Sequence, residues 1–375
     1  MTTDYATWMR KVLDLARKAE GRVSPNPMVG SVVLDHELGC CVCIAEGFHA
    51  GPGKWHAERE ALLALAEKKG YLDNCAKDCT IVVNLEPCCH FGRTPPCTDI
   101  IIQSGVRKVI VGMLDPDPRM AGKGIAKLRD AGIDVVVGVE EDACRHLNDA
   151  YLLARTLGRP RFTLKTAISL DGYTASAFGE SQWITNEHSR QQGHLLRNTH
   201  DGILVGVGTV LADNPSLQTR LLDHPTVHHP RPIVLDTRYR TPLDAKLRYA
   251  GAEPIFFVET GAAQSVDRGI CLAVSRTNEG LCLEEIASHL VAQGIYSVLL
   301  EGGSTIHRSF LAKGWVDRLE IFIAPKLLGG GKAFLSGLPF HLDVAPEFTL
   351  ESVQSHGGDV HVRYRRNTVG VQSTT

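Results

Sequence analysis

Three observations indicate an α/β protein made of two domains. Apolar, strand-like runs alternate with helical patterns up to residue 156, and a second alternating series starts at residue 161. The segment Gly158-Arg159-Pro160, which is typical of a hinge, separates the two series. A chain of 375 residues is also too long for one compact core.

The first series begins with an amphipathic helix over residues 4–20, after which Gly21 ends the helical pattern. The predicted strands of this series are 29–34, 40–45, 80–85, 108–113 and 134–137. The further predicted helices are 57–69, 98–104, 122–131 and 140–156. Strands and helices that alternate in this way form layers around a sheet. We place this domain at residues 1–146, followed by a linker helix end and hinge at 147–160.

The second series is assigned to a domain at residues 161–368, with a loose tail at 369–375. The predicted strands are 161–167, 202–207, 232–236, 254–258, 297–300 and 318–324, with helices at 186–199 and 283–292. A further helix is opened by residues 301–305 and ends at 312. Two late strands, 348–354 and 360–365, have the pattern of a closing hairpin.

Composition and charge narrow the classes of partner. The formal net charge is −2 and the pI is about 6.8, so no whole-protein field favours nucleic acid or a membrane surface. No apolar run approaches the ~18 residues of a membrane helix, and the N-terminus lacks the pattern of a secretory signal. We therefore expect a cytoplasmic protein. The odd number of cysteines, with adjacent pairs, does not resemble a disulfide framework.

One constellation carries definite chemistry. His56 and Glu58 form a His-x-Glu motif, and Pro87-Cys88 with Cys97 follows about thirty residues later. This order is the signature of zinc-dependent deaminases. We expect His56, Cys88 and Cys97 to bind one zinc ion with a fourth position left open, as a catalytic zinc site requires. Glu58 would then act as the proton shuttle beside a zinc-bound hydroxide.

The alternative is a closed structural zinc site in which Cys89 or His90 supplies the fourth ligand. Adjacent cysteines such as Cys88 and Cys89 rarely both reach one ion, and a structural site has no use for Glu58. The catalytic interpretation is therefore preferred.

The spacing of the two cysteine ligands departs from the general signature. Eight residues, not two, lie between Cys88 and Cys97, and this loop carries His90 and Arg93. A histidine there suits a polar heterocycle, and a guanidinium suits a phosphorylated substrate. Without the zinc site, Arg93 would be interpreted as a solvated loop charge.

Two earlier residues are further candidates for substrate contact. Asn26 lies between Pro25 and Pro27, which hold its amide on a stiff turn before a strand. That amide either contacts a base or only begins the strand, and the pattern does not decide between these. His49 lies on a glycine-rich loop ahead of Trp55.

The Pro-Asn-Pro-x-Val-Gly turn, His-Ala-Glu and Glu-Pro-Cys-x-His-x-Gly-Arg-Thr-Pro-Pro-Cys together resemble the bifunctional riboflavin-biosynthesis deaminase/reductase family. The family usually has serine where this chain has Cys89. The resemblance implies a cytidine-deaminase-like α/β/α domain followed by a dihydrofolate-reductase-like domain that uses NADPH. It also implies that the first domain deaminates a diaminopyrimidinone ribose phosphate, and that the second reduces the ribosyl group of the product to ribityl.

The resemblance continues through the second domain, in Lys165–Gly172, Gly179–Thr185, Leu211–Pro215 and Leu300–Gly303. By motif position it implies cofactor contacts from Ala167, Trp183, Thr209, Asp213, Gly303 and Ser304. It implies substrate contacts from Lys165, Asp171, Ser181, Arg197, Leu217, Arg220 and Glu301, with the two arginines suited to the phosphate.

The glycine clusters of this domain are weaker signals. The run from Glu301 to Thr305 lies between a strand and a helix, where glycines let backbone N–H groups approach a pyrophosphate. Gly206-Val207-Gly208-Thr209 is not a complete Gly-x-Gly-x-x-Gly fingerprint, because Leu211 holds the last position. A doubly wound dinucleotide fold is therefore not expected. We interpret His194, His200 and the group His224, His228 and His229 as surface residues.

Two rival functions remain at this point. One is a nucleic-acid base deaminase with an appended binding domain, which the near-neutral charge opposes. The other is a zinc-stabilised scaffold without activity, which the complete set of His56, Glu58, Cys88 and Cys97 opposes. Beyond a phosphorylated pyrimidine as substrate, we expect no nucleic-acid or membrane partner, and a homo-oligomer with a dimer favoured.

Overall fold

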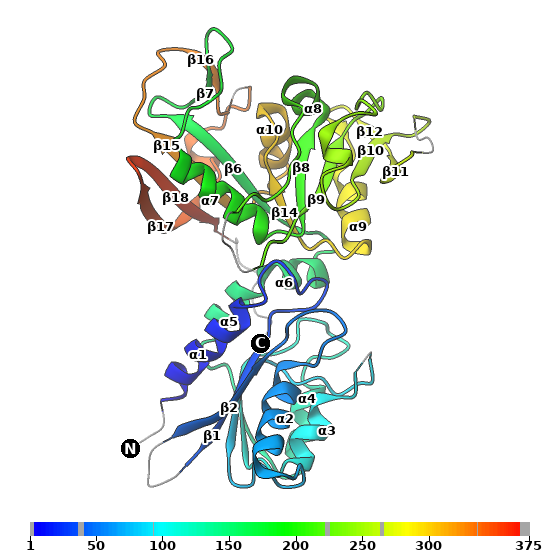
Figure 1. Cartoon of the computed structure of the whole chain (residues 1–375), viewed down its shortest axis with the longest axis vertical. Coiled ribbons are helices and arrows are strands. Elements are labelled where there is room, and N and C mark those ends of the chain that lie inside the picture. The colour runs from blue at the N-terminus through cyan, green and yellow to red at the C-terminus, as the bar shows by residue number, and fades with distance from the viewer. Residues whose placement is uncertain are drawn as a thin grey trace. The chain divides into compact units, whose positions relative to one another are not determined.

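The computed structural model describes residues 4–36, 41–92, 94–221, 226–262, 266–335 and 337–367. It divides into two compact units, Met1–Gly158 and Arg159–Thr375. Each unit has its own sheet with helices packed against it (Figure 1), which confirms the α/β class. The predicted tail at 369–375 lies outside the described residues.

The first unit is built on a five-stranded sheet in the order β2-β1-β3-β4-β5. β1 is antiparallel to both of its neighbours, whereas β3, β4 and β5 run parallel. The strands are β1 (Gly30–Asp35), β2 (Val42–Phe48), β3 (Thr80–Leu85), β4 (Lys108–Met113) and β5 (Asp134–Val137). Every residue of β3 is buried, as a strand at the centre of a covered sheet requires.

Helices cover both faces of this sheet and make three layers (Figure 1). One face carries α1 (Tyr5–Arg17) and α5 (Glu141–Leu147), and the other carries α2 (Ala57–Lys69), α3 (Cys97–Gln103) and α4 (Lys123–Asp130). The Asp4 carboxylate accepts hydrogen bonds from the N–H groups of Ala6 and Thr7, which begins α1. α2 ends at Gly70, in the left-handed conformation with a φ of 79°.

The predicted helix over 140–156 is wrong in one respect, because the chain forms two helices, α5 and α6 (Asp149–Thr156), that meet at Asn148. The buried Asn148 side chain bonds both backbone groups of Met28: its Oδ1 accepts from the N–H at 2.8 Å and its Nδ2 donates to the carbonyl at 3.0 Å. This tertiary contact fixes the segment that leads into β1, and the backbone at Asn148 leaves helical geometry.

The second unit contains a nine-stranded sheet in the order β11-β10-β9-β8-β14-β6-β15-β18-β17. The strands run parallel from β11 to β15, and β18 and β17 are antiparallel additions. Their bounds are β6 (Arg161–Ser169), β8 (Gly202–Gly206), β9 (Arg231–Leu235), β10 (Ile255–Glu259), β11 (Ile270–Val274), β14 (Ser297–Leu300), β15 (Arg318–Ala324), β17 (Phe348–His356) and β18 (Asp359–Arg366).

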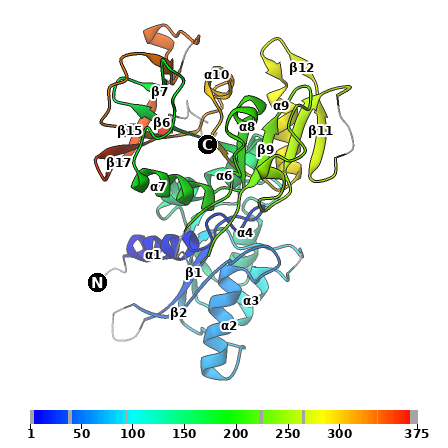
Figure 2. The same ribbon diagram turned by 45° about the horizontal axis from the view of Figure 1, so that its top comes forward.

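Alternate residues of these strands pack on opposite faces. Leu204 of β8 packs in one core with side chains of α9 (Leu283–Ala292) and α10 (Ser304–Ala312). Its neighbours Ile203 and Val205 pack in another core with α8 (Val207–Asp213). Another helix, α7 (Glu187–Asn198), labelled in Figure 2, buries Leu196 against Leu299 and Phe322.

Several short elements were not predicted. β7 (Tyr173–Ser176) pairs with β16 (Gly331–Ala333), and β12 (Arg276–Thr277) pairs with β13 (Gly280–Leu281). Two short 3₁₀ turns, Lys246–Arg248 and Leu342–Val344, were not predicted either. β11 was also missed, and Val207 begins α8 rather than ending a strand. β2 was predicted at 40–45 but extends to Phe48, because its pairing with Gly30 continues the ladder past the apolar run.

None of the described helices is long and apolar enough to cross a membrane.

Asn148→Ala should destabilise the first unit by about 1–3 kcal/mol, because it leaves the backbone N–H of Met28 buried without its acceptor. The loss of stability is measured by urea unfolding of the full chain, monitored with a spectroscopic probe placed in the first unit. Glu67→Ala, at an exposed position of α2, is the matched control and should shift the transition little. Equal stability of the two variants would contradict this role of Asn148.

Candidate active sites

The first candidate site lies at the N-terminus of α2. His56 is the N-cap residue, with an extended ψ of 158°, and Glu58 falls in the first helical turn. α2 can sit this close to the sheet because β2 carries Gly47, where a Cβ atom would lie 2.6 Å from the carbonyl oxygen of Ala57. A side chain at Gly47 would displace the turn that carries His56.

Three metal-binding side chains converge here from three elements. Cys88 follows the end of β3, and Cys97 is the first residue of α3. Each Sγ atom lies 3.4 Å from Nδ1 of His56, and the three donor atoms lie within 4.8 Å of one another. Among the described residues, these form the one group of three or more His, Cys, Asp and Glu side chains that could hold a metal ion.

The donor set fits zinc. One imidazole nitrogen and two thiolates are ligands that zinc prefers, and Zn–S bonds of about 2.3 Å in tetrahedral geometry keep the donors roughly 4 Å apart. Cys89 and His90 are not members of the convergent group. A zinc ion held by His56, Cys88 and Cys97 therefore keeps one coordination position for a further ligand.

The two thiols affect one another. Hydrogen bonds from Cys97 and from His56 lower the pKa of Cys88 to about 4. The Cys88 thiolate and burial in turn raise the pKa of Cys97. One thiolate is thus favoured by the fold itself, whereas the second requires a cation between the two sulfur atoms.

Glu58 is 3% exposed. Burial, followed by the charge of Cys88, raises the pKa of its carboxyl group to about 7. A bound divalent ion would favour the ionised form of this carboxyl group. Glu58 is therefore suited to take up and release a proton near neutral pH.

Hydrogen bonds join Asn26 to His49, and His49 to the backbone of Trp55, the residue before His56. Burial lowers the pKa of His49, which favours the neutral ring. Its Nδ1 lies 2.9 Å from the carbonyl oxygen of Trp55 and therefore donates, so that Nε2 accepts from Nδ2 of Asn26, also at 2.9 Å. The ring of His49 meets the ring of His56 edge to face, with centroids 5.3 Å apart. The turn around Asn26, which was predicted to be stiff, thus holds the Asn26 amide close to the metal-binding group.

The loop between the cysteine ligands is only partly described, because Arg93 lies outside the described residues. His90 is exposed, and Thr94 places its hydroxyl 3.5 Å from Nε2 of His56, the ring nitrogen that faces away from the thiols. A hydroxyl in this position can orient the ligand imidazole. Thr94 was not among the predicted site residues.

Glu86 was missed as well. Its buried carboxylate accepts four backbone hydrogen bonds, from Asp115, Gly122, Gly124 and Ile125, at 2.8–3.3 Å. These bonds fix the end of β3 against the start of α4, two residues before Cys88. The Glu-Pro-Cys sequence was the available signal, and only the partners at 115–125 show what the glutamate does.

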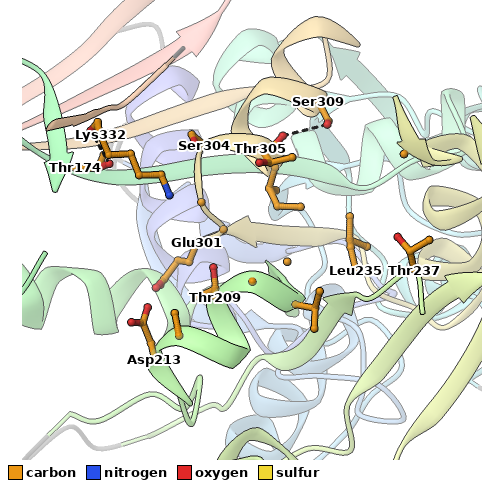
Figure 3. Close-up of a pocket in the computed structure, with 18 of the residues that line it drawn as sticks. Thr174, Thr209, Asp213, Leu235, Thr237, Glu301, Ser304, Thr305, Ser309 and Lys332 are labelled. Carbon is orange, nitrogen blue, oxygen red and sulfur yellow. Dashed lines mark hydrogen bonds between the residues drawn. The ribbon is translucent and has the colours of Figure 1, made fainter. Parts of the chain in front are cut away.

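The second candidate site is a cavity of about 1510 Å³ in the second unit. It is lined by the turn from β8 into α8, the end of β9, the turn from β14 into α10, and the β7 and β16 strands. Figure 3 shows Glu301, Thr209 and Asp213 at one side of the cavity, Ser304 and Thr305 above it, and Leu235 and Thr237 at the far end. Six of the predicted residues line it: Ser181, Thr209, Asp213, Glu301, Gly303 and Ser304.

The walls of this cavity fit a dinucleotide. α10 begins at Ser304 with Gly303 at its N-cap and no side-chain cap, which leaves N–H groups of its first turn for an anion. A Cβ atom at Gly208, in the opposite wall, would meet nothing within 4 Å and would project into free space. The volume of about 1510 Å³ exceeds the roughly 300–1,000 Å³ of an ordinary small-molecule pocket, which suits a ligand as long as a dinucleotide.

A buried ion pair borders the cavity. Arg197 donates to both carboxylate oxygens of Glu301, at 2.9 and 2.7 Å, and to the carbonyl of Gln218. Although burial opposes ionisation, Arg197 and Lys165 lower the pKa of Glu301 to about 2. Burial, together with Arg197 and Arg220, lowers the pKa of His194 to about 4. His194 is therefore a neutral member of a cationic cluster, and it is half-buried rather than fully exposed at the surface as predicted.

His200 was also wrongly assigned to the surface. It is 3% exposed, and its ring lies between the carbonyl oxygen of Leu196 and the hydroxyl of Thr163. His224 lies outside the described residues.

The other predicted residues lie away from the cavity lining. Asp171 accepts hydrogen bonds from the N–H groups of Leu328 and Gly329. Trp183 is 60% exposed, and the Arg190 guanidinium stacks on its ring at 4.5 Å. Ala167 packs beside Phe322, and Leu217 is buried with a φ of 57°. Lys165 and Arg197 lie beside Glu301, and Arg220 lies beside His194. These three basic residues are called the cationic cluster.

Comparison with known families agrees with both sites. The model of the cytidine and deoxycytidylate deaminase zinc-binding region matches residues 2–113. The model of the RibD C-terminal domain matches residues 160–362. The two matches cover the metal-binding group and the large cavity, respectively.

Individual relatives match over nearly the whole chain. The riboflavin biosynthesis protein RibD of Aquifex aeolicus is 42% identical over 96% of this chain and 98% of its own length. RibD of Escherichia coli is 37% identical over 94% and 97%. Similarity to RibD proteins over nearly the whole chain favours neither a nucleic-acid base deaminase nor an inactive zinc-stabilised scaffold.

Solved structures give the same result. The diaminohydroxyphosphoribosylaminopyrimidine deaminase/5-amino-6-(5-phosphoribosylamino)uracil reductase of Thermotoga maritima superposes with a TM-score of 0.85 at 37% identity, covering 97% of this chain and 99% of that one. RibD of Acinetobacter baumannii has a TM-score of 0.84 at 33% identity, covering 97% and 99%. The deaminase-like and reductase-like fold predictions are confirmed. This chain belongs to the RibD family of bifunctional riboflavin-biosynthesis enzymes, with a zinc-dependent deaminase domain and an NADPH-dependent reductase domain.

Proposed function

We propose that residues 1–146 hydrolyse the 2-amino group of 2,5-diamino-6-(5-phosphoribosylamino)pyrimidin-4-one, and that residues 161–368 reduce the ribosyl group of the product to ribityl. Residues 147–160 connect the two. The observation that carries the proposal is the convergence of His56, Cys88 and Cys97 beside the buried Glu58, on a chain similar to bifunctional relatives from end to end.

In the deaminase site, His56, Cys88 and Cys97 hold the zinc ion, which when bound lowers the pKa of a water molecule to ~7. Glu58 takes a proton from the attacking water and delivers it to the departing amino group. The ring carbon gains an oxygen and loses ammonia, so atoms and charge balance with one water consumed. Burial of Glu58 keeps bulk water from competing for that proton.

Four residues contact the substrate of this site in the proposal. The amide of Asn26, held by His49, keeps its oxygen and one N–H for the polar edge of the pyrimidine. His90 and Arg93, on the loop between the cysteines, approach the heterocycle and the ribose phosphate. An arginine at this rim suits a phosphate because its planar fork can bind two oxygens at once.

In the reductase site, NADPH would supply the hydride, and the residues of this chain would hold the cofactor and the substrate in position for its transfer. We propose that Gly303 and Ser304 receive the pyrophosphate at the start of α10, and that Thr209, Asp213, Ala167 and Trp183 border the rest of the cofactor. Lys165, Asp171, Ser181, Arg197, Leu217, Arg220 and Glu301 contact the substrate. The cationic cluster of Lys165, Arg197 and Arg220 outnumbers Glu301, which favours a phosphorylated ligand.

We also propose that the enzyme is cytoplasmic and forms a homodimer. The outermost strand of the nine-stranded sheet, β17, exposes Leu350 and Val353, with 52% and 58% of their surfaces accessible. Apolar side chains on an edge strand favour contact with a second copy. Sedimentation equilibrium of the full chain tests this assembly.

Glu58→Ala and the isosteric Glu58→Gln should keep one zinc ion per chain and lower the rate of ammonia release by about 100-fold to 10,000-fold, which is the usual contribution of a general acid–base group. Ammonia release is measured with the diaminopyrimidinone substrate, and zinc by atomic absorption. NADPH oxidation with the deaminated substrate is the control and should not change. Ammonia release at the wild-type rate would exclude the proposed role of Glu58.

Arg197→Ala should leave ammonia release unchanged and slow NADPH oxidation by roughly 100-fold or more, because it removes one partner of a buried charge pair. Both activities are measured on the same preparation. Normal ammonia release then shows that the first unit is folded, and NADPH binding reports on the second. Simultaneous loss of both activities would argue for one shared site.

A further inference from the structure

Two cations that line the large cavity have no ion-pair partner in the described part of the chain, and only one of them lies away from the site proposed for the pyrophosphate. Three basic residues line the cavity: Arg240, Lys313 and Lys332. Lys313 forms an ion pair with Glu284. Lys332 lies at the same side as Glu301 and Asp213 in Figure 3, and its Nζ is 3.5 Å from the position that a Cβ of Gly303 would occupy. Arg240 makes no ion pair or side-chain hydrogen bond with any described residue.

We infer that Arg240 binds the 2′-phosphate of NADPH and thereby selects NADPH over NADH. The inference rests on the proposed position of the cofactor, with its pyrophosphate at the start of α10. It goes beyond that position by naming the side chain that distinguishes the two cofactors.

The direction of the cofactor follows from the two ends of the cavity. The cationic cluster that suits the phosphorylated substrate lies beside Glu301, so the nicotinamide must lie at this end to deliver a hydride. Ser304 lies above Glu301, Thr305 lies farther along the cavity, and Leu235 and Thr237 lie at the far end (Figure 3). The adenosine half therefore reaches the segment after β9, where Thr237 and Arg240 both line the wall.

The segment that carries Arg240 is held in place before any ligand binds. The fully buried Asp236 carboxylate accepts from the N–H and the hydroxyl of Thr241, at 2.7 and 2.8 Å. Tyr239 adopts a left-handed φ of 51°, and its ring meets Phe256 edge to face at 5.4 Å. Its hydroxyl accepts a hydrogen bond from Arg248 at 2.8 Å. A fixed segment costs little ordering entropy when it binds a phosphate.

The chemistry of the two cofactors explains the selection. A phosphate monoester carries about −1.5 to −2 charges at neutral pH, whereas NADH has a hydroxyl group at the same position. A guanidinium can donate two parallel hydrogen bonds to a phosphate, and the hydroxyl of Thr237 can donate a third. Lys313 cannot replace Arg240 without breaking its pair with Glu284.

The test compares Arg240→Leu with Arg238→Leu in the full chain. Arg238 is an exposed arginine two residues away that does not line the cavity. Calorimetry measures the binding of 2′,5′-ADP and of 5′-AMP, which differ only in the 2′-phosphate. Kinetics measure kcat/KM for NADPH and for NADH with the deaminated substrate.

We expect Arg240→Leu to weaken 2′,5′-ADP binding and lower kcat/KM for NADPH by roughly 10- to 100-fold, the contribution of charged hydrogen bonds. Values for 5′-AMP and NADH should change little, and Arg240→Lys should recover part of the loss. Arg238→Leu should resemble the wild type.

Two results would overturn the inference while the proposed cofactor site stands: an unchanged preference for 2′,5′-ADP in Arg240→Leu, or an equal loss in Arg238→Leu. If the wild-type chain binds neither NADPH nor 2′,5′-ADP, the proposed cofactor site is itself wrong, and the inference falls with it.

Discussion

The first unit is arranged to bring one imidazole and two thiolates within reach of a single ion. These three side chains come from the start of α2, the end of β3 and the start of α3, so their meeting depends on how the helices sit on the sheet. Gly47 lets α2 approach β2, and Glu86 ties the end of β3 to α4 through four backbone N–H groups. The close approach at Gly47 and the four hydrogen bonds of Glu86 thus both fix segments that carry predicted metal ligands.

In the described part of the second unit, an ion pair rather than a metal-binding group fixes the side chains at the candidate site. The reacting end of this unit has no metal-binding group among the described residues and depends on the ion pair of Arg197 and Glu301. A buried ion pair contributes little net stability, because desolvation offsets much of the attraction. It does fix the orientation of both groups, and hydride transfer needs orientation more than a strong acid or base. Lys165 beside this pair adds positive charge where a phosphorylated substrate would lie.

Motif reasoning predicted the three side chains that converge in the structure, because zinc-binding chemistry is visible in residue type and spacing alone. His56, Cys88 and Cys97 have few other uses in that order, and the strands at 80–85, 108–113 and 134–137 were predicted with their observed bounds. The family resemblance supplied the residues predicted for the reductase site, of which six line the cavity and the others lie away from its lining.

What the sequence could not show depends on partners that are distant along the chain. Asn148 interrupts a helical pattern because of Met28, 120 residues away, and Glu86 meets its donors only after α4 is in place. His200 has no pattern that marks it as buried, and the half-buried position of His194 likewise arises only when α7 packs against the sheet. Short strands such as β7 and β16 carry no apolar run and form only when both are brought together.

The most direct measurement follows both reactions at once in the full chain. With the diaminopyrimidinone substrate and NADPH, ammonia should be released before NADPH is oxidised, and the two amounts should converge to one to one. Without NADPH, ammonia release should continue at the same initial rate, since no residue or cofactor of the proposed deaminase site belongs to the reductase unit. NADPH oxidation that precedes ammonia release, or ammonia release that requires NADPH, would contradict two separate sites acting in this order.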